Sequence, residues 1–201
     1  MAELIETIWN LPRIELRELS SVSETRPAAV LTGKRSWAAV GSLLKLPIVV
    51  QAEPYSARYD MLEDLAANLP EQVKVVYGVG GGLVSDIAKY VAWKNDVPCV
   101  IIPTALSVDG FFTSLVAVRK DNSVYYENTG PAEKVIIDMD VVSGAPREIR
   151  GTGIVEILSM TTGLLDWRYA ADKKKNTYIE RYQPWAAGIA AGIAQQAYKI
   201  A

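Results

Sequence analysis

The sequence predicts an α/β fold, a doubly wound and Rossmann-like parallel sheet followed by the start of an all-helical domain. Short apolar runs alternate with helical patterns from Ala28 onward, and three consecutive glycines follow one of these runs. From Ala145 the pattern is helical to the end of the chain. Continuous apolar strands between helices are typical of a parallel sheet covered on both faces. We therefore expect an α/β domain at residues 1–145 and a partial, incomplete helical domain at residues 146–201.

The first strands and helices are read from these runs in order. The expected strands are AAVLTG, PIVVQAE, KVVYGVG and VPCVIIPT, and helices are expected near residues 36–44, 56–69 and 83–94. The apolar residues of the third helix share one face by their helical spacing, which predicts that this face packs on the sheet.

The pattern changes after Ile102. Two extended runs flank Lys120, Asp121 and Asn122, which predicts a β-hairpin, and the run KVIIDMD predicts a further strand. Gly188 and Gly192 lie on one face of a final helix, and the chain stops inside this helical pattern. We expect either a missing C-terminal segment or a partner, such as a second copy, that covers the exposed half-domain.

Composition limits the classes of partner. The formal net charge is −2 and no long basic run occurs, so neither a nucleic-acid surface nor a lipid-binding patch is expected, and small molecules are favoured. The most apolar stretch, near the C-terminus, is shorter and more polar than the roughly 20 residues of a membrane span. The single cysteine, Cys99, excludes an internal disulfide and indicates a reducing, cytoplasmic location.

Histidine is absent from the sequence. A mechanism that needs an imidazole base or an imidazole metal ligand therefore cannot be completed by this chain alone.

The glycines Gly80, Gly81 and Gly82 lie between an expected strand and an expected helix. Glycine lets the backbone approach a ligand closely, and the first amides of the following helix attract an anion such as a pyrophosphate. Alternatively, the glycines form a tight turn and nothing more.

A second polar loop follows the next strand. It runs from Pro103 to Ser114 and contains Thr104, Ser107 and Asp109. Because ligands of parallel sheets bind at the carboxyl ends of the strands, these side chains are expected to face the same crevice as the glycines. The alternative for Asp109, which precedes a glycine, is a simple turn.

Together, GVGGGLVSDIAKYVA and IIPTALSVDGFFTS resemble the iron-containing alcohol dehydrogenase and dehydroquinate synthase superfamily, and most closely its glycerol-1-phosphate dehydrogenase branch. The resemblance covers roughly residues 28–170. A dehydroquinate-type synthase fits the second loop less well. The resemblance implies hydride transfer between NAD or NADP and a polyol or glycerol phosphate, with a ketone such as dihydroxyacetone phosphate as the other partner.

The resemblance also implies roles for single residues. Gly80, Gly81 and Gly82 would hold the pyrophosphate, and Thr104, Ser107 and Thr113 would contact the dinucleotide. Asp109 would contact the substrate and is the expected catalytic residue. Asp86 and Lys89 match a motif pair that we interpret as mainly structural.

Glu53 follows the strand PIVVQA, where an acidic residue could hold the adenosine ribose; a solvated loop charge is the alternative. The residues from Gln51 to Tyr55 do not decide between NAD and NADP.

The expected metal site departs from the family pattern. Glu156 stands where the family has an aspartate that ligates zinc or iron, and Met160 stands where the family has a lysine. The extra methylene of glutamate moves its carboxylate by roughly 1 Å, which is more than a metal site tolerates. Two interpretations of Glu156 follow, a metal ligand or a carboxylate at the start of a helix.

The sequence leaves two functions open. One is a metal-assisted, NAD(P)-dependent oxidoreductase of the glycerol-1-phosphate dehydrogenase type. The other is a non-catalytic or degenerate nucleotide-binding module that has lost the metal site.

Overall fold

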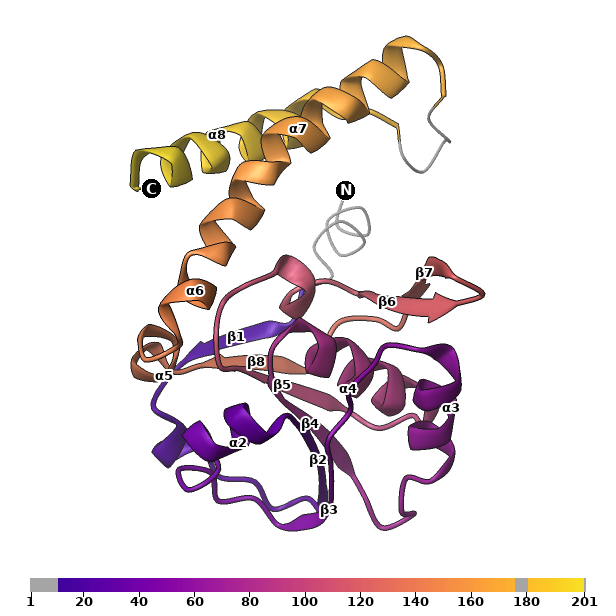
Figure 1. Cartoon of the computed structure of the whole chain (residues 1–201), viewed down its shortest axis with the longest axis vertical. Helices are drawn as coiled ribbons and strands as arrows, with labels where there is room; N and C mark the ends of the chain where they lie inside the picture. The colour runs from indigo at the N-terminus through magenta and orange to yellow at the C-terminus, as the bar shows by residue number, and fades with distance from the viewer. Residues whose placement is uncertain (1–10, 176–180, 201) are drawn as a thin grey trace, which may run out of the picture. The chain divides into compact units, whose positions relative to one another are not determined.

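A computed structural model describes residues 11–175 and 181–200, and Figure 1 shows its helices and strands. The chain divides into two compact units, Met1–Pro146 and Arg147–Ala201.

The first unit is built on a six-stranded sheet in which every pairing is parallel, as Figure 1 shows. The strands stand in the order β1-β8-β5-β4-β2-β3. Their bounds are β1 Arg13–Leu16, β2 Ala28–Thr32, β3 Ile48–Ala52, β4 Val75–Gly80, β5 Cys99–Pro103 and β8 Lys134–Ile137. All residues of β2, β4 and β5 are buried, which explains why their sequences are continuously apolar. The predicted parallel α/β fold is confirmed.

Helices cover both faces of the sheet because alternate residues of each strand point to opposite sides. On one face, α3 (Tyr59–Ala67) and α4 (Gly82–Lys94) pack on Leu31, Val76 and Ile101. On the other face, α2 (Lys34–Val40) packs on a second cluster that contains Val30, Tyr77 and Val100. Helices α2 and α3 are shorter than expected from the sequence, whereas α4 agrees within one residue.

The order of the strands creates a switch point between β2 and β4. The chain passes from β2 to β3 on one side and then returns to β4, which lies on the other side of β2. The loops that follow β2 and β4 therefore leave in opposite directions from neighbouring strands. A crevice at this point of the carboxyl edge is where open α/β sheets bind their ligands.

The predicted hairpin is present. Strand β6 (Leu115–Lys120) pairs antiparallel with β7 (Ser123–Asn128), and the turn between them is Asp121 and Asn122. Both turn residues have positive φ, 52° and 58°, as a two-residue hairpin turn requires.

Strand β1 was not expected from the sequence. It is short and carries charged residues next to exposed apolar ones, and it is held at the edge of the sheet by its pairing with β8. Helix α5 (Met139–Ser143) follows β8, and the buried carboxylate of Asp138 accepts hydrogen bonds from Asp140 N and from Leu19 N. These long-range contacts fix elements that no local pattern indicates.

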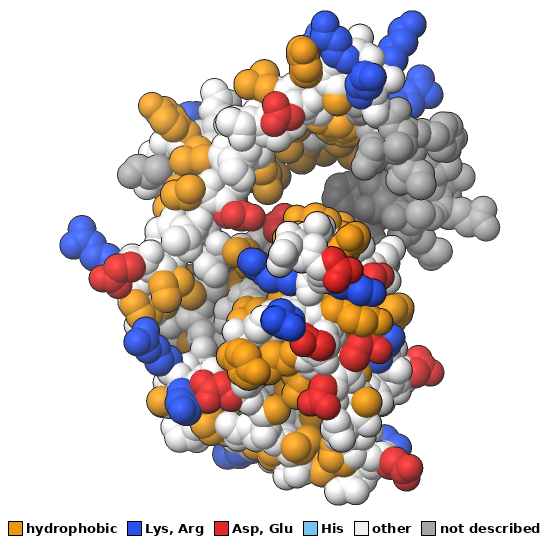
Figure 2. Space-filling view, turned by 45° about the vertical axis from the view of Figure 1, so that its right-hand side comes forward, with side chains coloured by type: hydrophobic (Ala, Val, Ile, Leu, Met, Phe, Trp, Pro, Cys, Tyr) orange, Lys and Arg blue, Asp and Glu red, His pale blue; other side chains and the backbone are white. Residues whose placement is uncertain are grey.

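The second unit is helical, as expected. Its described residues form α6 (Arg147–Arg150), α7 (Thr152–Asp172) and α8 (Pro184–Ile200), and α7 packs against α8. Only three alanines of α8 are buried and no residue of α7 is. Hydrophobic side chains therefore lie on the surface of these helices, as Figure 2 shows; examples are Leu165 and Tyr198. Among the described residues, no helix combines the length and the apolar composition needed to cross a membrane.

Candidate functional site

The glycine loop begins at Gly80, the last residue of β4. Its φ is +153°, a conformation that residues with a side chain rarely adopt. A Cβ atom at Gly80 would also lie 3.2 Å from Ser36 Oγ and 3.3 Å from Val84 Cγ2. Glycine is therefore required here by the turn itself and by close packing.

The next two glycines differ from each other. A Cβ atom at Gly82 would lie 2.8 Å from Val108 Cγ2, so this glycine lets the second loop pack on the start of α4. A Cβ atom at Gly81 would meet no atom within 4 Å, and the backbone there is extended, with φ −88° and ψ −173°. Neither packing nor backbone geometry explains Gly81. The space beside Gly81, the residue that precedes the first amides of a helix of thirteen residues, is open and is instead suited to the approach of an anion.

The second loop lies beside the glycine loop. Thr104 N donates to Gly80 O at 3.2 Å, and Thr104 Oγ1 lies 3.2 Å from Ser36 Oγ. These contacts bring together the loops that follow β2, β4 and β5 at the carboxyl edge of the sheet. Ser36 was missed by the sequence reasoning. The signal that could have found it is a hydroxyl residue shortly after the glycine that ends the β2 strand pattern.

The other expected site residues of this loop differ in their exposure and contacts. Ser107 is partly buried, and Asp109 is exposed at the first position of a short 3₁₀ helix, Asp109–Phe111. Thr113 Oγ1 donates to Leu115 O at 3.4 Å, so this hydroxyl is turned toward its own chain. The hydroxyl of Thr113 would have to rotate before it could donate a hydrogen bond to a dinucleotide.

Asp86 and Lys89, which we interpreted as structural, are bonded to the segment that carries Asp109 and Thr113. Lys89 is 2 % exposed, and its ammonium donates to the carbonyl groups of Gly110, Thr113 and Leu115. Burial lowers the pKa of Lys89, and the nearby Asp86 carboxylate opposes that effect. The sequence interpretation and the observed contacts agree.

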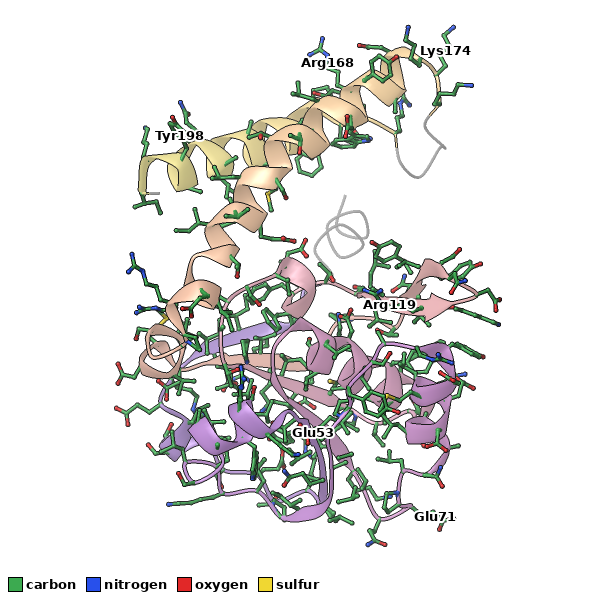
Figure 3. The ribbon with its side chains drawn as sticks, in the orientation of Figure 1. Glu53, Glu71, Arg119, Arg168, Lys174 and Tyr198 are labelled. Atoms are coloured by element: carbon green, nitrogen blue, oxygen red, sulfur yellow. The ribbon has the colours of Figure 1, made fainter. Side chains whose placement is uncertain are left out.

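Glu53, labelled in Figure 3, directly follows β3. Its Oε1 accepts a hydrogen bond from Lys34 N at 3.1 Å, and Lys34 Nζ lies 3.8 Å from Oε2. The side chain is 47 % exposed. Glu53 is thus a half-exposed carboxylate that is fixed at the start of α2, beside the switch point, and a ribose-binding role stays a prediction.

The expected metal ligand, Glu156, lies in the second unit. It is the fifth residue of α7, and the first turn of that helix contains no acidic residue, so the interpretation as a helix-start carboxylate was wrong. Within residues 11–175 and 181–200, no group of three or more His, Cys, Asp or Glu side chains could hold a metal ion. The described residues do not fit zinc or iron, and metal binding by Glu156 stays a prediction that requires ligands from elsewhere.

A second polar cluster lies near the amino edge of the sheet. Glu24 Oε2 accepts hydrogen bonds from Arg26 at 2.8 Å and from the hydroxyl of the buried Tyr77 at 2.9 Å. Arg26 also donates to Glu133 at 2.9 Å. The hydrogen bonds from Arg26 lower the pKa of Glu24 to about 2, whereas burial and the Glu24 contact raise the pKa of Tyr77. These groups bind one another, which indicates a stabilising role.

Sequence comparison agrees with the resemblance noted above. The sequence profile of iron-containing alcohol dehydrogenase matches residues 15–146. A glycerol-1-phosphate dehydrogenase [NAD(P)+] of Methanothrix thermoacetophila is 28 % identical over 183 residues, which cover 87 % of this chain and 50 % of that protein. The corresponding enzyme of Thermofilum pendens is 32 % identical over 169 residues, which cover 80 % and 46 %.

Solved structures share the fold. An NADH-dependent butanol dehydrogenase A of Thermotoga maritima has a TM-score of 0.70 at 18 % identity, covering 94 % of this chain and 55 % of that one. A glycerol dehydrogenase of Schizosaccharomyces pombe has a TM-score of 0.64 at 27 % identity, covering 78 % and 45 %. The chain spans about half the length of the curated relatives it matches. It belongs to the iron-containing alcohol dehydrogenase family.

Proposed function

We propose that the first unit binds NAD or NADP at the carboxyl edge of its sheet. The amides that follow Gly80, Gly81 and Gly82 would receive the pyrophosphate, and Thr104, Ser107 and Thr113 would contact the rest of the dinucleotide. The single observation that carries this proposal is the open space at Gly81, since the structure gives that glycine no packing or conformational reason. The bound nicotinamide would supply a hydride acceptor or donor.

The reaction we propose is that of an oxidoreductase acting on a polyol or a glycerol phosphate. The relatives are glycerol-1-phosphate dehydrogenases, which suggests glycerol 1-phosphate as the alcohol, and dihydroxyacetone phosphate would be the ketone. Asp109 is exposed beside the cofactor loops and would bind or orient the substrate. Because the described residues do not fit a metal, we assign them the cofactor half of the site and derive no step through a metal ion.

A second candidate function is a nucleotide-binding module without catalysis. The observation that favours it is the absence of histidine from the sequence, together with the lack of a metal-binding group among the described residues. This candidate shares the cofactor site with the first and differs only in turnover.

Small molecules are the partners we propose, and a reducing compartment such as the cytoplasm suits the buried free thiol of Cys99, whose pKa burial raises to about 12. The exposed apolar side chains of α7 and α8 favour association with more protein, either a further segment or a second copy.

Two measurements test the proposal. In the first, NADH or NADPH is titrated into the chain while energy transfer from its tryptophans is recorded; a saturable signal is expected, and its absence at about millimolar cofactor would contradict the proposed site. In the second, glycerol 1-phosphate oxidation and dihydroxyacetone phosphate reduction are assayed with and without added Zn²⁺ or Fe²⁺. Turnover would exclude the non-catalytic candidate, and binding without turnover would favour it.

A further inference from the structure

All hydrogen-bond donors of the Lys89 ammonium are bonded to protein groups within the first unit. Its Nζ donates to Gly110 O at 2.8 Å, to Leu115 O at 2.8 Å and to Thr113 O at 3.1 Å. An ammonium has three donors, so all of them are satisfied by carbonyl groups of one short segment. Because an unpaired charge is very costly to bury, this side chain is held in the interior by those carbonyl groups.

Asp86 lies three residues earlier on α4 and binds the backbone at Ala117, just after the same segment. Its Oδ2 accepts a hydrogen bond from Ala117 N at 3.1 Å, and its Oδ1 lies 3.8 Å from Lys89 Nζ. Burial raises the pKa of Asp86, and the Ala117 amide and Lys89 oppose that effect. The two charges thus partly compensate each other while each binds the backbone of the segment.

The segment held in this way carries two expected site residues. Asp109 directly precedes Gly110, and Thr113 itself contributes one of the three carbonyl groups. Val108 packs where a Cβ atom at Gly82 would lie, so the same segment also contacts the first turn of α4. One helix therefore begins at the glycine loop and, through its second and third turns, fixes the position of Asp109 and Thr113.

We propose that Lys89, assisted by Asp86, is a positioning residue that keeps the Gly110–Leu115 backbone in register with the glycine loop. This inference rests on the proposed function, because it concerns the geometry of the same cofactor site. Lys89 has no role of its own in binding, since its donors are occupied. It acts on the cofactor through the segment that it holds.

The test compares two ligands on one variant. NADH spans the whole site, whereas ADP carries only the adenosine and the diphosphate. Lys89→Met keeps a side chain of similar length and removes the ammonium, so the carbonyl groups of Gly110, Thr113 and Leu115 lose their donor. We expect NADH affinity to fall about tenfold, because the released segment must become ordered again when NADH binds, and ADP affinity to stay within about twofold, because the glycine loop proposed to hold the diphosphate is unchanged.

Two further measurements separate positioning from general stability. Hydrogen exchange of the amides of residues 111–115 is expected to accelerate in Lys89→Met under conditions where circular dichroism shows a folded protein. Lys94→Met, on the same helix, removes an ammonium that forms a partly exposed ion pair with Glu63 at 2.9 Å. This control is expected to leave NADH affinity, ADP affinity and the exchange rates unchanged.

Several results would overturn the inference. These are unchanged NADH affinity in Lys89→Met, equal weakening of NADH and ADP, and unchanged exchange at residues 111–115. If Lys89→Met does not fold, Asp86→Asn, which keeps an acceptor for Ala117 N, is expected to weaken NADH about threefold and to spare ADP, and a failure to do so would count equally against it. If the wild-type chain binds neither ligand, the proposed function fails, and the exchange rates alone still decide whether Lys89 holds the segment.

Discussion

The polar groups at the two edges of the parallel sheet differ in whether they are bonded to other protein groups. Near the amino edge, Glu24, Arg26, Tyr77 and Glu133 are bonded to one another. At the carboxyl edge, Gly81 faces open space and Asp109 is exposed. Charged residues alone therefore do not mark a binding site. What distinguishes the carboxyl edge is that a Cβ atom at Gly81 would meet no other atom within 4 Å and that the carboxylate of Asp109 is exposed.

This difference predicts that substitutions at the two edges have opposite consequences. Changes at the amino edge should alter the free energy of unfolding and leave cofactor binding unchanged. Changes that fill the open space at Gly81 should alter cofactor binding and leave the free energy of unfolding unchanged, whereas Gly80 and Gly82 are also needed for packing.

The largest effect is expected for Glu24→Gln. The Glu24 side chain is only 7 % exposed, and a fall in its pKa from 4.5 to about 2 corresponds to about 3 kcal/mol at neutral pH. Urea denaturation at pH 7 should show a loss of this order, and NADH affinity should stay within about twofold of wild type because the substitution lies at the opposite edge. A variant as stable as wild type would show that the amino-edge cluster contributes nothing.

The same carboxylate predicts a pH dependence with a definite sign. The pKa of Glu24 is lower in the folded state than in the unfolded state, so its contribution is fully present above pH 4.5 and is lost as the pH falls toward about 2. The stability difference between wild type and Glu24→Gln should therefore shrink across this window. Denaturation curves at several pH values measure it, and a difference that grows on acidification would contradict the assignment.

A smaller effect, on binding alone, is expected for Gly81→Ala. Its backbone angles are accessible to alanine, and the new methyl group would occupy the open space where we place the pyrophosphate. The free energy of unfolding should change by less than about 0.5 kcal/mol, whereas NADH should bind about tenfold more weakly. Gly163→Ala is a matched control, because a Cβ atom there also meets nothing within 4 Å, and it should leave binding unchanged. Equal NADH affinity in wild type, Gly81→Ala and Gly163→Ala would contradict a pyrophosphate site at Gly81.

The smallest effect is expected for Asp60→Asn. Arg58 and Asp60 form a pair at 2.7 Å with the same spacing in sequence as Glu24 and Arg26, but their side chains are 67 % and 65 % exposed. Solvent screens such a pair, so the urea midpoint should equal that of wild type at pH 7. A clear loss of stability would mean that burial is not what separates the two carboxylates.

Much of the fold could be predicted because its determinants are local. The buried strands β2, β4 and β5 are continuously apolar, and Asp121 and Asn122 supply a hairpin turn. Strand β1 could not be predicted in the same way, since its short charged sequence becomes a strand only by pairing with β8.

The candidate site could be predicted only in outline. Glycines after a strand indicate a ligand loop, but the sequence cannot tell that Gly80 and Gly82 are needed for packing and that Gly81 is not. The bond between Ser36 and Thr104 joins residues far apart in the chain, which no local pattern shows. The position of Glu156 beyond the first turn of α7 depends on where that helix begins, and helix ends are poorly defined by sequence.

The central claim is that a dinucleotide binds at the carboxyl edge, above Gly81. Amide chemical shifts of the ¹⁵N-labelled chain, recorded during a titration with NADH, test it most directly. Saturable shifts are expected at Gly81, Gly82 and Thr104, and none at Arg26 and Glu133. Shifts that cluster at the amino edge, or no shifts at the glycine loop while NADH is bound, would contradict it.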